Sequence, residues 1–134
     1  MATYTNWSSL KRGLQKELRA AMEDALDLSK EAVYTETQAF YGGGTPVEYE
    51  RSGAFGNSAE RTEVYGSGDS LAGEVYMNGN YAYLNGSRPS GFTVFMWAEE
   101  GAAGIVGTTG TWERAEQQIK WMVDSAFADH FGRV

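Results

Sequence analysis

The sequence predicts an α+β domain in which a long N-terminal helix packs on a three- to four-stranded antiparallel sheet and a C-terminal helix follows. Helical periodicity runs through 6–41 and again through 111–131, while 61–98 contains short alternating segments between glycines. Because strands and helices do not alternate, we expect an antiparallel sheet. At 134 residues without cysteine, the chain 1–134 is interpreted as one domain that buries its core without disulfides.

The segment 6–41 is the dominant feature of the chain. Its small and apolar residues recur in steps of three and four, so they share one face of a helix: Trp7, Leu10, Leu14, Leu18, Ala21, Ala25, Leu28 and Ala32. Asn6 or Ser8 can cap its start, and the glycines from Gly42 supply a stop where positive φ costs little. We expect the Leu10–Leu28 face to pack on the sheet.

The predicted helix is long relative to the domain. At about 1.5 Å per residue it spans roughly 50 Å. A globule of this chain length has a diameter of about 36 Å. The helix therefore either kinks at Gly13 or overhangs the body, and an overhanging apolar stripe calls for a partner.

The middle of the chain predicts the sheet. Residues 71–77 alternate between two faces, and 61–65 precede them across a glycine-rich loop at 66–70, which indicates an antiparallel hairpin. A third short strand is predicted at 81–84. The aromatic and β-branched run 92–98 is predicted as a further strand.

The last third predicts a glycine-rich loop at 101–110 and a helix over 111–131 that Thr111 caps. The main apolar stripe of this helix contains Trp112, Ala115, Ile119, Met122 and Ala126. Trp121 and Phe127 lie off that stripe. A helix that is apolar on two sides is normally sandwiched, either inside its own domain or between subunits.

Charge and motifs argue against several functions. The formal charge of −7 is unfavourable for gripping phosphates, so we expect no sequence-specific nucleic-acid binding. Neither an apolar run of membrane-spanning length nor a secretion leader is predicted. No nucleotide-binding, metal-binding or nucleophile motif occurs. We therefore predict no catalytic residue, no cofactor-binding residue and no metal ligand.

The remaining candidates for acid–base chemistry are few. His130 is the only histidine, and near the end of a helix it is interpreted as a favourable charge. The carboxylates of Glu48, Glu50, Glu99 and Glu100 are interpreted as solvated charges. A Glu-dependent hydrolase that uses pairs in the 48–63 region remains an alternative function.

Aromatic residues suggest a second alternative. Several of them lie on predicted strands that cannot all turn under one helix: Tyr76, Tyr81, Tyr83, Phe92, Phe95 and Trp97. Most should belong to the core. The others would line a sheet face that is open to a neighbour, because aromatic anchors are enriched at interfaces. A small cytoplasmic binding module with an aromatic sheet face is therefore another possible function.

A short signature follows the long helix. It reads Thr45-Pro46, then Tyr49-Glu50-Arg51-Ser52-Gly53-Ala54-Phe55-Gly56-Asn57-Ser58. With the long amphipathic helix before it and the strands, glycine-rich loop and final helix after it, the chain resembles the small neck or tail-completion proteins of siphophage-type tailed bacteriophages. These are also described as tail components or minor capsid proteins. Ser52 and Phe55 depart from the Thr and Leu that are common in the family.

This resemblance implies a structural virion protein that forms a homo-oligomeric ring at the head–tail junction and contacts neighbouring connector and tail proteins. It implies neither catalysis nor a cofactor, no membrane, and DNA that passes through the ring without sequence-specific binding. The segment 42–60 is predicted as a mobile docking segment, although an ordinary loop is an equally open interpretation.

The physical properties of the signature fit docking. Arg51 offers five donors in a rigid fork, Gly53 permits a bend, and Phe55 can anchor in a pocket when a neighbouring subunit arrives. The predicted assembly interface consists of Tyr49, Arg51, Gly53, Phe55, Trp97 and Trp121.

Overall fold

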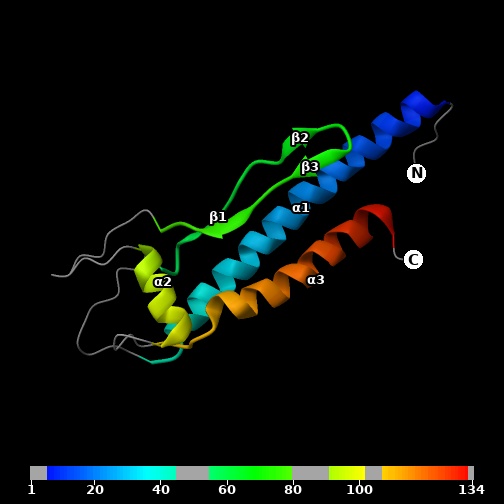
Figure 1. Cartoon of the computed structure of the whole chain (residues 1–134). Helices are drawn as coiled ribbons and strands as arrows, with labels where there is room; N and C mark the ends of the chain where they lie inside the picture. Colours follow the sequence, from blue (N-terminus) through cyan, green and yellow to red (C-terminus); the bar gives the residue numbers. More distant parts are fainter. Residues whose placement is uncertain (1–5, 45–54, 80–90, 102–106, 133–134) are drawn as a thin grey trace.

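The structure is a computed structural model that describes residues 6–44, 55–79, 91–101 and 107–132 (Figure 1). Its elements are α1 (Trp7–Tyr41), β1 (Ala59–Arg61), β2 (Tyr65–Ser67), β3 (Ser70–Ala72), β4 (Val75–Met77), α2 (Gly91–Glu100) and α3 (Thr111–Phe131). The four strands form two antiparallel two-stranded sheets. The α+β class and the two long terminal helices are therefore confirmed, while the predicted strand at 81–84 lies outside the described residues.

The first helix is continuous over 35 residues, through Gly13, as its periodicity predicts. The Asn6 side chain caps its start by accepting a hydrogen bond from the Ser9 N–H at 2.9 Å. Gly42 is the C-cap, but its φ of −70° is ordinary right-handed backbone. The stop therefore does not use the positive φ that the glycine run predicted at this position.

One face of α1 packs along α3. Contacts from α3 reach Glu17 and Asp24 on one edge of this face and Glu36 on the other. The alanines between them, Ala21, Ala25 and Ala32, are buried. These residues belong to the apolar stripe that was expected to face the sheet, so that expectation is wrong. The small side chains allow the second long helix to approach closely.

The hairpin β1–β4 covers another side of α1. Leu26 lies against Gly73, where an added Cβ would be 2.4 Å from the Leu26 Cδ1. Arg61 of β1 reaches Glu23 and Asp27 on the same side of the helix. The first helix is thus the middle layer of the molecule, between the hairpin and α3 (Figure 1).

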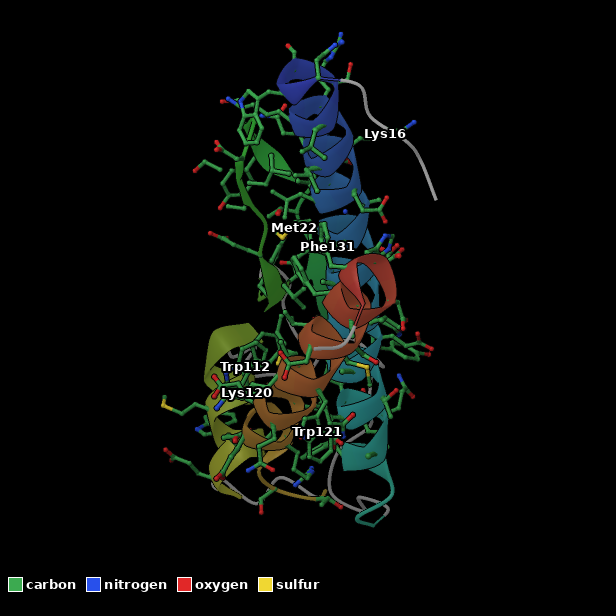
Figure 2. The ribbon with its side chains drawn as sticks, turned by 90° about the vertical axis from the view of Figure 1, so that its right-hand side faces the viewer. Lys16, Met22, Trp112, Lys120, Trp121 and Phe131 are labelled. Atoms are coloured by element: carbon green, nitrogen blue, oxygen red, sulfur yellow. The ribbon has the colours of Figure 1, made fainter. Side chains whose placement is uncertain are left out.

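The N-terminal turns of α1 overhang this body. His130, in the last turn of α3, contacts Glu17, and the tip of the hairpin lies near Gln15. The turns before these residues extend beyond α3 (Figures 1 and 2). Trp7 is 72% exposed and Leu14 is 47% exposed. Of the two outcomes expected for so long a helix, the overhang is the one observed.

The hairpin differs in detail from its sequence prediction. Ser67 pairs with Ser70, so the turn is Gly68-Asp69 instead of the whole loop 66–70. Gly68 has a φ of +63°, which suits a tight hairpin turn. The pairing Arg61 to Val75 becomes Tyr65 to Ala72 further along, so residues 62–64 lie opposite residues 73–74. This one-residue excess is a bulge, and it divides the hairpin into two short ladders.

The segment predicted as a strand at 92–98 is the helix α2, so that prediction is wrong. Phe95 packs against a buried cluster to which Ala98 belongs, and Glu99 bonds to the start of α3. Positions i, i+3 and i+4 share one side of a helix but not of a strand. Tertiary contacts therefore override the strand propensity of the aromatic and β-branched residues.

Phe55 lies in the core of the described chain. It is 4% exposed, and its ring centroid is 4.8 Å from that of Phe40 and 5.7 Å from that of Phe95. Ala98 completes this buried cluster. The expectation that Phe55 stays available until a neighbouring subunit arrives is therefore corrected, because its ring is already buried within its own chain.

Replacing Phe55 tests this packing. Phe55→Ala should lower the free energy of unfolding by about 3–5 kcal/mol, because it removes a buried ring and leaves a cavity. Trp121→Ala is the matched control: Trp121 is 71% exposed, so its loss should change stability by no more than about 0.5 kcal/mol. Urea unfolding followed by circular dichroism measures both. Equal small effects would show that Phe55 contributes no core packing.

Candidate functional site

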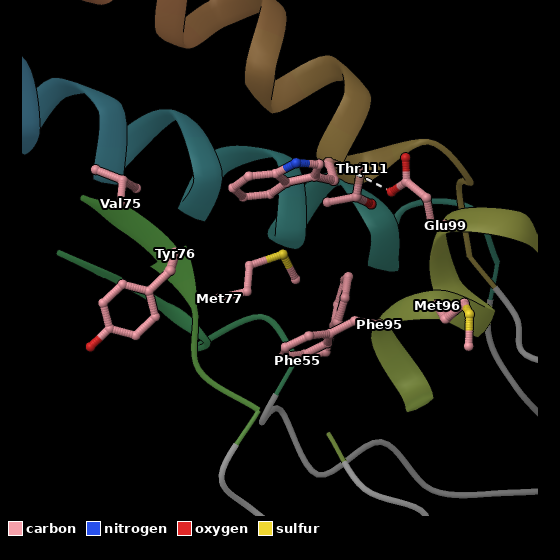
Figure 3. Close-up of a pocket in the computed structure, with 9 residues that line it drawn as sticks. Phe55, Val75, Tyr76, Met77, Phe95, Met96, Glu99 and Thr111 are labelled. Atoms are coloured by element: carbon pink, nitrogen blue, oxygen red, sulfur yellow. Dashed lines mark hydrogen bonds between the residues drawn. The ribbon is translucent and has the colours of Figure 1, made fainter. Parts of the chain in front are cut away.

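An open groove of about 380 Å³ lies between β4, α2 and α3 (Figure 3). Its walls are mainly aromatic and thioether side chains, and the residues that line it are Phe55, Val75, Tyr76, Met77, Phe95, Met96, Glu99, Thr111 and Trp112. Pockets of this kind bind through apolar walls and a few placed polar groups. Of the aromatic residues that the sequence indicated, Tyr76 and Phe95 line this groove, whereas Tyr81 and Tyr83 lie outside the described residues.

Glu99 is the charged side chain among the residues that line this groove. Glu99 accepts a hydrogen bond from the backbone N–H of Trp112 at 2.7 Å (Figure 3). It also accepts one from the backbone N–H of Glu113 at 3.2 Å. A carboxylate at this position satisfies unpaired donors and the positive end of the helix dipole. The capping of α3 was assigned to Thr111, and that assignment is wrong. The N-cap residue is Gly110, with no side-chain bond of its own.

The Thr111 hydroxyl is the unusual polar group of the groove. Thr111 is 1% exposed, and its Oγ1 has no hydrogen-bond partner within the described part of the chain. An unpaired buried hydroxyl costs about 1–3 kcal/mol. Thr111 therefore lies beside the groove with its hydroxyl oxygen covered by the protein.

Acidic residues of α1 hold the other elements in place. Arg61 of the hairpin bonds to Glu23 and Asp27, each at 2.6 Å. The hydrogen bond to Glu23 is the main cause that raises the pKa of Arg61. Glu36, whose side chain is 9% exposed, accepts from Arg114 at 2.8 Å and from Gln118 at 2.5 Å. These carboxylates serve the packing of the fold.

The single histidine joins the two long helices. His130 bonds through Nε2 to Asp24 and through Nδ1 to Glu17. The hydrogen bond to Asp24, followed by that to Glu17, raises the pKa of His130 above its ordinary value. The favourable helix-end charge predicted for this residue thus has two specific carboxylate partners, and its imidazole bridges the two long helices.

The predicted interface residues separate in the structure. Tyr49, Arg51 and Gly53 lie outside the described residues. Trp97 is half-buried on α2, whereas Trp121 is 71% exposed on α3. Phe55 is the member of the predicted set that lines the groove. The groove was missed because Trp112, Thr111 and Glu99 meet only when 91–100 is a helix.

Three further observations bound the function. The described residues contain no group of three or more His, Asp or Glu side chains that is placed to hold a metal ion. None of the described helices has the length and hydropathy needed to cross a membrane. Comparison of the chain with protein-family models, curated proteins and solved structures gives no match. A functional assignment must therefore come from the residues and their geometry.

The capping role of Glu99 is testable. Glu99→Ala should lower the free energy of unfolding by about 1 kcal/mol, within a range of about 0.5–2, because two N–H groups of α3 lose their acceptor. Glu100→Ala is the control, since Glu100 is exposed and adjacent. Thermal unfolding of both variants measures the difference. If the two substitutions cost the same, the carboxylate of Glu99 does not act as a cap.

The bridge at His130 should make stability depend on pH. A pKa raised in the folded state means that the bridge contributes fully below the ordinary histidine value of 6.5 and is lost as pH rises through the folded value. The melting temperature of wild type should therefore exceed that of His130→Gln at pH about 6, and the gap should shrink by pH about 9. A gap that is constant or grows with pH would contradict this bridge.

Proposed function

We propose that this chain is a non-enzymatic structural subunit of a tailed-phage virion, acting at the head–tail junction. Its resemblance to neck and tail-completion proteins supports this assignment, through the long helix, the Thr45–Ser58 signature and the order of the later elements. In this proposal the chain assembles with copies of itself and with neighbouring connector and tail proteins.

One structural observation carries the proposal: each of the two long helices exposes a tryptophan. Trp7 on α1 is 72% exposed and Trp121 on α3 is 71% exposed. Tryptophan is among the commonest anchors of protein interfaces, where it supplies a large apolar area at low conformational cost. Two such anchors on a pair of packed helices favour a subunit whose exposed tryptophans are buried by neighbouring subunits.

The use of the acid–base residues favours a structural role over the hydrolase. Glu99 caps α3, and His130 is held between Glu17 and Asp24. Glu48 and Glu50 lie outside the described residues, so their pairing carries no argument for catalysis. The net charge of −7 suits a conduit through which DNA passes without adhering.

The aromatic groove favours a second candidate, a small binding module. Its 380 Å³ volume and its aromatic and thioether walls suit a small apolar ligand. Met96→Trp separates the two candidates, because Met96 lines the groove and is 56% exposed. A larger side chain there should abolish ligand binding but leave head–tail joining intact.

The proposal is tested by deleting the coding sequence from the phage or prophage that carries it. We expect separate heads and tails by negative-stain electron microscopy and loss of infectivity. Wild-type chain supplied in trans should restore joined particles, as should the Met96→Trp variant.

The Trp121→Ala variant should restore joining poorly, because its exposed anchor is removed. Circular dichroism of the purified variant establishes that it is folded. Normal infectious particles in the absence of the chain would overturn the proposed function. Restoration by wild type but not by Met96→Trp would favour the groove as the functional site.

A further inference from the structure

The overhanging turns of α1 continue an interface that is already formed further along the helix. Trp7, Leu10 and Leu14 lie on the same helical face as the alanines that pack on α3. That interface stops where His130 meets Glu17, because α3 ends one residue later. The apolar stripe of α1, which we call the apolar seam, continues beyond this point toward the start of the helix. We call residues 7–16 the α1 overhang.

The α1 overhang is basic although the chain is acidic. Lys11, Arg12 and Lys16 are exposed on it, and residues 7–16 contain no acidic side chain. Lys11 borders the apolar seam, and the other two lie further around the helix. Among the described residues, no ion pair involves these three cations. The α1 overhang therefore carries an exposed apolar stripe, and all of its charged side chains are positive.

The side of α3 that faces away from α1 has the opposite character. Trp121 lies at one edge of this side, in line with Arg114, which bonds to Glu36 of α1, and the buried residues Ala115 and Ala126 lie on the α1 side of the helix. Glu113, Glu116 and Asp124 are exposed on this outward side, together with the cation Lys120. We call this surface the outer face of α3. This surface has a net negative charge and carries one exposed tryptophan that can act as an interface anchor.

We propose that the α1 overhang of one copy docks on the outer face of α3 of a second copy. Both surfaces carry a tryptophan that is more than two-thirds exposed, and their charges are complementary. Within one copy, α3 packs along α1 only as far as Glu17. The α3 helix of the second copy would pack on the turns of α1 that lie beyond this point. This inference rests on the proposed function and names the contact by which copies assemble.

Charge decides between two arrangements of the copies. If two overhangs met each other, Lys11, Arg12 and Lys16 of each copy would face like charges, which is unfavourable. Contact between the overhang and the outer face instead joins two different surfaces, so every copy can bind one neighbour on each side. Such head-to-tail contacts generate closed rings or open filaments.

The contact should be reversible. The overhang is about 15 Å long, so each contact is small compared with the interface of a stable dimer. Association should therefore increase with protein concentration and weaken as salt screens the exposed charges. Sedimentation velocity over a concentration series measures both trends.

A mixing experiment gives the sharpest test. One variant carries Trp7→Glu and Leu14→Glu, which damage the overhang and leave α3 intact. The other carries Trp121→Lys and Asp124→Lys, which damage the outer face and leave the overhang intact. Each variant alone should be monomeric. Their equimolar mixture should form a dimer and nothing larger, because only one pair of intact surfaces remains.

A matched control is Tyr34→Glu, which places a charge on α1 at a residue that is 46% exposed but lies outside both surfaces. It should assemble like wild type, and circular dichroism should show that every variant is folded. Dimers of the outer-face variant alone would overturn the head-to-tail arrangement in favour of overhang-to-overhang contact. Wild-type chain that stays monomeric at every concentration would overturn self-docking altogether.

The test separates this inference from the proposed function. Monomeric wild type together with separated heads and tails in the deletion would defeat self-docking and leave the virion role standing. Head-to-tail association together with normal particles in the deletion would defeat the virion role and leave the docking contact standing.

Discussion

The packing of α3 along α1 is the constraint on which the rest of the structure depends. Buried alanines on α1 let the helices approach closely, and polar contacts at Glu36 and at His130 fix their register at opposite ends. Because α1 has 35 residues and α3 has 21, this register leaves the excess length at one end. The overhang is therefore a consequence of where the polar contacts at Glu36 and His130 join the two helices.

Charge distribution follows from the same arrangement. The acidic residues in the middle of α1 are paired with donors from the hairpin and from α3, including Arg61, Arg114 and His130. The cations at the start of α1, Lys11, Arg12 and Lys16, form no ion pair with either layer among the described residues. An acidic protein thus presents a basic apolar end, while the outer side of α3 carries a net negative charge.

The aromatic residues divide into structural and exposed sets. Phe40 and Phe55 are buried against each other. Their contact holds the segment around Phe55 against the C-terminal end of α1. Trp7 and Trp121 stay in solvent on the two long helices. Burial stabilises the first pair in every copy of the chain, whereas the second pair gains comparable apolar contact only when another molecule covers it. This contrast separates core residues from candidate assembly residues within one residue class.

The sequence by itself determined the two long helices, the hairpin between them and the α+β class, because periodicity and glycine turns are local signals. It also predicted that the first helix kinks or overhangs, and it placed Trp121 off the main apolar stripe of the last helix. Tertiary structure decided the remaining features, including α2, the burial of Phe55 and the capping of α3 by Glu99. The physical reason is that residues 92–98 have strand propensity, and only contacts with distant residues make a helix more favourable there. Which side of α1 would face α3 was likewise set by partners far apart in the chain.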